Sequence, residues 1–265
     1  MLEIFQYSFM LRAFAAGTII GIIAPLIGSF LVARRYSLIA DSLSHVALAG
    51  VAIGLLTGIY PIYSAIAVAI IVALLIEHLR SSKRISGEMA LAIFLSGGLA
   101  IAITLISLSS GFNVDLFSYL FGSITTVTTT DIWTISILGI ATLLIIILLY
   151  KELFFISFDE ESARVSGLPT KTINNILIIL AAITVGLSMR IVGILLIGAL
   201  MVIPVVTAIQ LARSFKQSLG LASLLGLLSV IIGLFAAYYL NLPAGGAIVI
   251  LALIFLLLAI MVRKR

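Results

Sequence analysis

The chain has 265 residues, of which 63% are hydrophobic and 9% are charged, and its mean hydropathy is +1.37. Soluble domains carry about 25% charged residues, so this composition excludes a water-soluble globular protein and indicates an integral membrane protein. The chain has no cysteine, which excludes disulfides and thiolate metal sites. The net charge of +5 is explained by the membrane topology described next, and we expect no nucleic-acid partner.

Hydrophobic segments long enough to cross a bilayer, about 20 residues each, follow one another along the whole sequence. We expect one all-α transmembrane domain over residues 1–265, with nine spans and a range of eight to ten. The predicted spans are 8–33, 37–58, 61–79, 86–109, 131–150, 172–189, 191–212, 218–240 and 245–262. The stretch 111–130 is interpreted as an external loop, and the number of spans changes if it enters the membrane.

The basic residues are distributed unevenly between the two sides of these spans. When the spans alternate in direction, all of the 15 Lys and Arg residues except Arg12 and Arg190 fall on one side. The positive-inside bias makes that side the cytoplasm. We therefore expect an external N-terminus and a cytoplasmic C-terminus.

Glycines recur at four-residue spacing in two of the first spans. One series is Gly17 and Gly21, and the other is Gly50, Gly54 and Gly58. This spacing leaves one helix face flat enough for a neighbouring helix to approach closely. We interpret both series as helix-packing positions.

The sequence SFDEESARVSGLPT, residues 157–170, predicts a short helix on the basic side. Ser157 and Glu160 have the spacing of a capping box, acidic residues fill the first turn, and Gly167 comes where the helix should end. An isolated helix this short is marginal in water and needs packing to persist. It either rests on its own protein or docks onto a partner.

A polar island, SLIADSLSHVALAG, begins the second predicted span at residues 37–50. Asp41 and His45 are four residues apart, so both project from one face of a helix. A carboxylate with an imidazole suits a divalent ion such as Zn²⁺, Mn²⁺ or Fe²⁺. The alternative is a buried hydrogen-bonded pair, although an ionisable pair inside a span is by default a functional-site hypothesis. Hydrolysis by Ser42 or Ser44 is disfavoured, because neither has triad spacing to both partners.

Five blocks of the sequence, in order, resemble the membrane permease of ATP-binding-cassette transporters that import zinc, manganese and iron(II). They are IGSFLVARRYSLIADSLSHVALAGVAIGLL, VDLFSYLFGSI, SFDEESARVSGLP, IVGILLIGALMVIPVVTA and LPAGGAIVIL. The resemblance implies a multi-pass permease in a prokaryotic plasma or inner membrane. It also implies a second copy of the chain, two cytoplasmic ATP-binding subunits and an extracytoplasmic metal-binding protein as partners.

The same resemblance assigns roles to individual residues. Asp41 and His45 fall on metal-pathway positions, and residues 157–168 fall on the helix that couples the permease to its ATPase. The residues expected to take part in coupling are Phe158, Asp159, Glu160, Ala163, Val165 and Gly167. The blocks LPAGG and VDLFSYLFG lean toward the zinc members. Metal is then the transported substrate, and no permanently bound cofactor is expected.

The sequence contains no G-x4-G-K-[ST] phosphate-binding loop, so nucleotide that drives transport must bind another chain. We therefore expect a transport subunit and no enzyme activity in this chain. The alternative is a divalent-cation carrier or channel driven by an ion gradient. Such a carrier normally needs several polar or acidic residues within its spans, whereas the predicted membrane interior here offers essentially Asp41 and His45.

Overall fold

The computed structural model describes residues 3–82, 85–108 and 116–263. Within these ranges the chain is helical and contains no strand. The elements are η1 Glu3–Gln6, α1 Ser8–Ala33, α2 Ile39–Thr57, α3 Pro61–Ser81, α4 Gly87–Leu108, α5 Leu116–Phe121, α6 Thr129–Leu148, α7 Tyr150–Phe158, α8 Glu160–Val165, α9 Thr170–Ser188, α10 Ile197–Leu211, α11 Phe215–Leu240 and α12 Ala244–Arg263. Eight helices are long and apolar enough to span a membrane, and α10 is shorter. The all-α polytopic fold predicted from hydropathy is confirmed.

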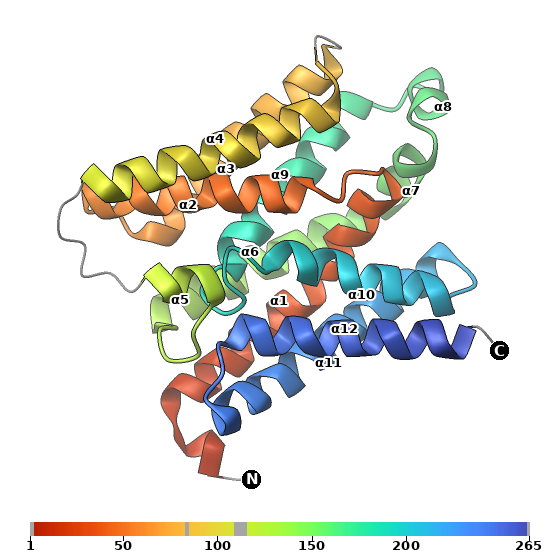
Figure 1. Ribbon diagram of the computed structural model, residues 1–265. Helices are drawn as coiled ribbons and strands as arrows, with labels where there is room; N and C mark the ends of the chain where they lie inside the picture. The colour runs from red at the N-terminus through yellow and green to blue at the C-terminus, as the bar shows by residue number, and fades with distance from the viewer. Residues whose placement is uncertain (1–2, 83–84, 109–115, 264–265) are drawn as a thin grey trace.

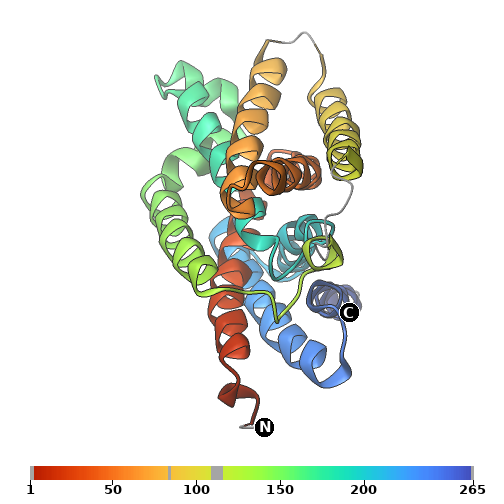
Figure 2. The same ribbon diagram turned by 90° about the vertical axis from the view of Figure 1, so that its left-hand side faces the viewer.

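The long helices form two groups joined by α1 (Figure 1). In the first group α2 packs against α3 and α4, and α3 packs against α9. In the second group α10, α11 and α12 pack against one another. Helix α1 contacts α9, α10 and α11, so it connects the groups. Figure 2 shows α2, α10 and α12 nearly end-on, which places them roughly parallel.

One end of the bundle, which we call the basic end, carries the end of α1, the α7–α8 segment, the end of α10 and the described C-terminus (right side of Figure 1). The opposite end, which we call the outer end, carries α5 and the turn between α9 and α10. These names follow the side on which the sequence concentrates its Lys and Arg residues.

The glycine series at the start of the chain pack as predicted, with one exception. A Cβ atom at Gly17 or Gly21 would meet α11, and one at Gly50 or Gly54 would meet α3 or the turn before it. Gly58 has no neighbour within 4 Å and adopts φ +73° as the C-cap of α2. It ends the helix, because its left-handed backbone conformation costs glycine little.

The predicted span 191–212 is shorter than expected. Helix α10 begins only at Ile197, since the preceding turn pairs with α5: Ile194 N–H donates to Tyr119 O (2.9 Å) and Leu195 N–H donates to Leu120 O (3.2 Å). Gly193, at φ +86°, allows this close contact. Residues 116–121 of the predicted external loop 111–130 therefore form the short helix α5, which packs on the bundle, while residues 111–115 of that loop lie outside the described ranges.

Candidate functional site

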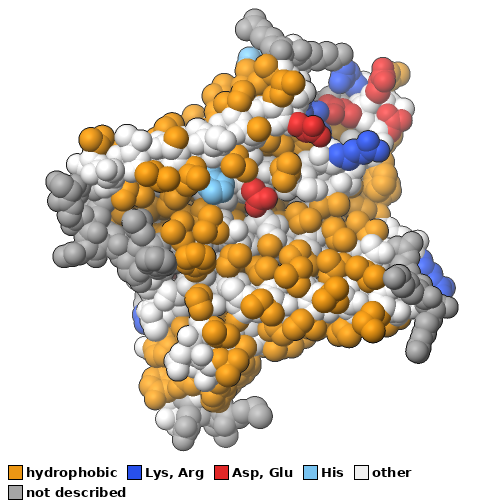
Figure 3. All heavy atoms as spheres, in the orientation of Figure 1, with side chains coloured by type: hydrophobic (Ala, Val, Ile, Leu, Met, Phe, Trp, Pro, Cys, Tyr) orange, Lys and Arg blue, Asp and Glu red, His pale blue; other side chains and the backbone are white. Residues whose placement is uncertain are grey.

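Asp41 and His45 lie one turn apart near the beginning of α2, and both side chains are half-buried. They are close enough to interact electrostatically. Figure 3 shows one histidine and one acidic side chain side by side in the middle of a face that is otherwise largely hydrophobic. The helix spacing inferred from the sequence is thus present, with both polar groups reachable from one apolar face.

Two glycines from other helices allow close packing around this pair. Gly198, in the first turn of α10, lies directly against the Asp41 carboxylate, where a Cβ atom would collide with Oδ1. Gly98 of α4 lies against the α2 backbone, and its Cβ would come within 2.8 Å of Val46 N. Neither glycine was predicted from the sequence to pack at the site, although glycine inside an apolar helix is itself a signal that another helix approaches closely.

The start of α10 also accounts for the depth and the charge of Asp41. Helix α10 has 15 residues, about 22 Å at 1.5 Å per residue, so its first turn lies well inside the bundle as measured from the basic end. A helix N-terminus carries partial positive charge that stabilises a nearby carboxylate. Asp41 therefore lies beside the positive end of the α10 dipole, since Gly198 is in that first turn.

Ser42 and Ser44 of the polar island are buried and are occupied in hydrogen bonds. Ser42 Oγ donates to Leu91 O of α4 (2.9 Å), and Ser44 Oγ donates to Asp41 O (2.7 Å). His45 Nδ1, in contrast, has no hydrogen-bond partner among the described residues. Among the described residues this leaves an imidazole nitrogen and a carboxylate side by side, which are group types that can ligate a divalent ion.

The pair does not form a complete metal site by itself. Among the described residues, no group of three or more His, Cys, Asp or Glu side chains is placed to hold a metal ion. A four-coordinate ion such as zinc needs further ligands or water beyond the two side chains available here.

The predicted cytoplasmic helix is present but shorter than expected. Ser157 belongs to α7, and α8 covers only Glu160–Val165. The N-cap is Asp159, whose Oδ1 accepts from Ser162 N–H (2.9 Å), so the predicted Ser157 capping box is wrong. The extended backbone of Asp159 (φ −150°, ψ 88°) separates the two helices, and Gly167 at φ +86° ends the segment as predicted.

Of the three apolar coupling residues, Phe158 is 61% exposed, whereas Ala163 is buried. Ala163, which was expected to take part in coupling, is fully buried within the chain and presents no surface to a partner. Val165 is 84% exposed. Phe158 ends α7 and packs against Phe154 and Phe215. Of these three apolar residues, Val165 is the one that lies on α8 and is exposed.

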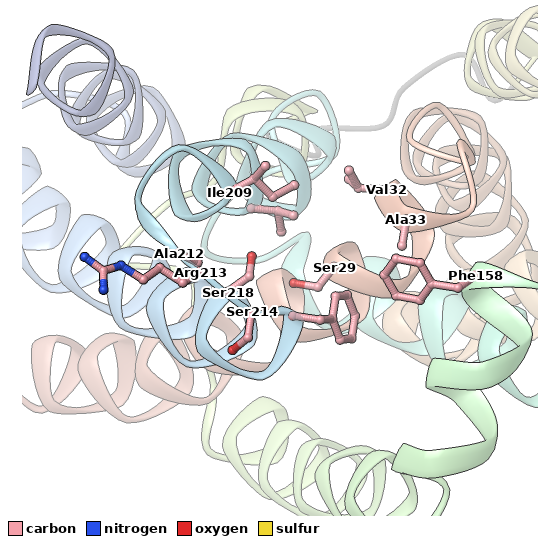
Figure 4. Close-up of a pocket in the computed structure, with 11 residues that line it drawn as sticks. Ser29, Val32, Ala33, Phe158, Ile209, Ala212, Arg213, Ser214 and Ser218 are labelled. Carbon is pink, nitrogen blue, oxygen red and sulfur yellow. The ribbon is translucent and has the colours of Figure 1, made fainter. Parts of the chain in front are cut away.

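Phe158 also borders a cavity at the basic end of about 390 Å³, between α1, α7, α10 and α11. Figure 4 shows Phe158 on the side of the cavity formed by Ser29, Val32 and Ala33 of α1. Ser214 and Ser218 lie on the opposite side. The aromatic contact with Phe215 of α11 ties the end of α7 to the second helix group.

Comparison with known proteins agrees with this architecture. A protein of Treponema pallidum named "Probable metal transport system membrane protein" is 39% identical over 255 residues, covering 96% of each chain. The manganese transport system membrane protein MntC of Listeria monocytogenes is 34% identical over 98% of this chain and 92% of its own. The solved structure of PsaBC from Streptococcus pneumoniae in complex with Fab matches with a TM-score of 0.84 and 33% identity, covering 97% of this chain and 92% of that one.

A family model described as the ABC 3 transport family matches residues 6–263. This range contains all the long helices, the Asp41–His45 pair and α8. The resemblance inferred from five sequence blocks is confirmed over nearly the whole chain, and the chain belongs to the ABC 3 transport family of metal-transport membrane permeases.

Proposed function

We propose that this chain is the permease of an importer for divalent transition-metal ions, in which two copies form one pathway lined by Asp41 and His45. The observation that carries the proposal is the half-buried pair at the centre of an apolar face. A twofold axis beside that face would bring two carboxylates and two imidazoles together. Those groups could supply the four N and O ligands that one chain lacks.

The transported ion is proposed to be manganese, with zinc and iron(II) as the ions to compare. The sequence blocks lean toward zinc, but the relatives whose names give a metal, MntC among them, are manganese systems. Carboxylate and imidazole ligands accept all three ions, so the ligand types do not choose among them. The preference for manganese therefore rests on the relatives' names.

The energy for transport is proposed to come from separate cytoplasmic ATPase subunits that contact α8, with an extracytoplasmic binding protein delivering the metal. Helix α8 is favoured as the contact because it is a separate short helix and because its Val165 is exposed. Changing Val165→Asp should weaken copurification of the ATPase by at least about tenfold, a cost of ~1.4 kcal/mol. Leu242→Asp, at an exposed apolar site on the outer end, should leave copurification unchanged.

The decisive experiment is to reconstitute the purified permease with its ATPase and binding protein and to measure metal entry and ATP hydrolysis with Mn²⁺, Zn²⁺ and Fe²⁺ separately. The proposal expects metal entry that requires ATP and is fastest with Mn²⁺. Entry driven by an ion gradient without ATP would instead establish the carrier alternative. ATP-dependent entry fastest with Zn²⁺ would keep the importer and overturn only the manganese assignment.

A further inference from the structure

Glu160, the first residue of α8, receives side chains from three long helices at the basic end. Its Oε2 lies 3.4 Å from Arg34 Nη2, at the end of α1, and 3.5 Å from Arg80 Nη1, in the last turn of α3. Its Oε1 accepts a hydrogen bond from Asn174 Nδ2 of α9 (2.9 Å). One carboxylate thus connects α8 to α1, α3 and α9, and Figure 3 shows acidic and basic side chains gathered at this corner.

Arg80, the partner of Glu160 on α3, is also held by contacts that do not involve α8. Arg80 donates to both oxygens of the buried Glu77, with Nε to Oε2 at 2.9 Å and Nη2 to Oε1 at 2.6 Å. Its guanidinium also lies over the Tyr36 ring, 5.5 Å from the centroid. A guanidinium fixed by a bidentate pair loses little freedom when it binds a second carboxylate.

Apart from Glu160, most side chains of α8 are exposed, so the contacts of Glu160 are a large part of what holds this helix. A six-residue helix does not persist without packing, and Ala163 is the buried residue of α8. The next acidic residue, Glu161, is exposed and has no ion pair among the described residues. Asp159 and Gly167 interrupt the helical backbone on either side, so α8 is not continuous with α7 or α9.

We propose that Glu160 is a positioning residue that fixes α8 to the ends of α1, α3 and α9, so that movement imposed on α8 shifts these helices instead of rotating α8 alone. A shift of α3 would also act on α2, which carries Asp41 and His45, because the two helices pack closely. Gly50 of α2 lies against Ala65 of α3. This inference rests on the proposed function, in which an ATPase moves α8. Glu160 was expected to take part in coupling, and we assign its role there to contacts within this chain.

The Glu160 carboxylate stays charged over the physiological pH range. Burial raises the pKa of Glu160, but the positive charges of Arg80 and Arg34 lower it more, and the net pKa is below the ordinary value of 4.5. A carboxylate with a lowered pKa contributes stability above its ordinary pKa and loses it as pH falls through the lowered value. Attachment of α8 is therefore insensitive to pH near neutrality.

The test is the amount of metal transported per ATP hydrolysed, measured in proteoliposomes containing the permease and its ATPase. Glu160→Ala should lower this ratio by at least about fivefold, the low end of measured couplings between sites, while ATP hydrolysis and ATPase copurification remain. Glu160→Gln, which keeps the side chain's size, should lower it less and guards against misfolding of the alanine variant. Glu88→Ala, at an exposed glutamate in the first turn of α4 with no ion pair among the described residues, is the matched control and should keep the parent ratio.

A cross-link separates a mechanical link from a merely structural role. The chain has no cysteine, so Glu160→Cys combined with Asn174→Cys can be joined by a short, cleavable thiol reagent. The ratio should recover on cross-linking and fall again on cleavage. An unchanged ratio in Glu160→Ala, loss of the bound ATPase, or no recovery on cross-linking would each overturn the inference. A parent protein without ATP-dependent metal entry would instead refute the proposed function.

Discussion

At the scale of single residues, Asp41 and His45 differ from their polar neighbours because they have unused bonding capacity. Replacing Asp41→Asn or His45→Ala removes a ligand while leaving the packing of α2 largely intact. We expect each variant to lower metal uptake by at least about tenfold, since even outer-shell partners of metal ligands cost 10–100-fold. The measurement is metal accumulation in metal-limited cells.

The matched control for this pair is Ser44→Ala on the same helix, whose hydroxyl bonds only the carbonyl of its own turn among the described residues. It should accumulate metal like the parent. All three variants should still dimerise and copurify with the ATPase. Parent-level uptake by Asp41→Asn or His45→Ala would show that the pair is an ordinary polar contact.

Gly98 and Gly97 provide a matched test of the packing around the site. A methyl group at Gly98 would press on the backbone of Val46 and His45, whereas one at Gly97 meets nothing within 4 Å. Gly98→Ala should destabilise the protein by about 1–3 kcal/mol and lower metal uptake. Gly97→Ala should leave uptake unchanged and slightly raise the melting temperature, because alanine favours a helix interior over glycine. Equal effects of the two would contradict the packing described here.

At the scale of elements, hydropathy predicts the long helices well because each must satisfy its own backbone in lipid. It fails at residues 191–196, where an apolar stretch forms a turn whose backbone pairs with α5. The apolar composition is the same in a span and in a buried turn. That pairing depends on residues far apart in the sequence, so no local pattern predicts it.

The α7–α8 segment shows the same limit for the candidate site. Capping spacing predicts that Ser157 begins the helix, whereas in the structure Ser157 is buried in α7 and Asp159 is the N-cap of α8. The i, i+4 relation of Asp41 and His45 follows from helix geometry and was predictable. The burial of Ala163 and the partners of Glu160 arise from tertiary contacts and were not.

The orientation of the elements can be tested by labelling, since the chain contains no native cysteine. Ser162→Cys lies on exposed α8, and Leu242→Cys lies in the exposed turn between α11 and α12. If the basic end is cytoplasmic, an impermeant thiol reagent should label Leu242→Cys in intact cells and Ser162→Cys only after permeabilisation. The reverse pattern would invert the topology and remove the argument for an ATPase contact at α8.

At the scale of the whole molecule, the structure combines a lipid-compatible exterior with one face that carries a polar pair. Large exposed apolar side chains cover α4, α6 and α12, as expected for helices that face lipid. Asp41 and His45 are half-buried on that face, and an ionisable pair there would be costly to leave in lipid. Covering that face with a second copy would both shelter the pair and complete its coordination.

This sharing of ligands between copies predicts a specific behaviour of mixed dimers. A dimer of one parent chain and one Asp41→Asn chain, isolated through two different tags and reconstituted with the ATPase, contains one impaired half. If each copy transported metal independently, the mixed dimer would retain half of the parent rate. We expect a rate well below half, because a single pathway between the copies loses one of its two carboxylates. A mixed dimer with a Ser44→Ala chain should keep the parent rate, and half-activity in the Asp41→Asn mixture would show that each chain carries its own pathway.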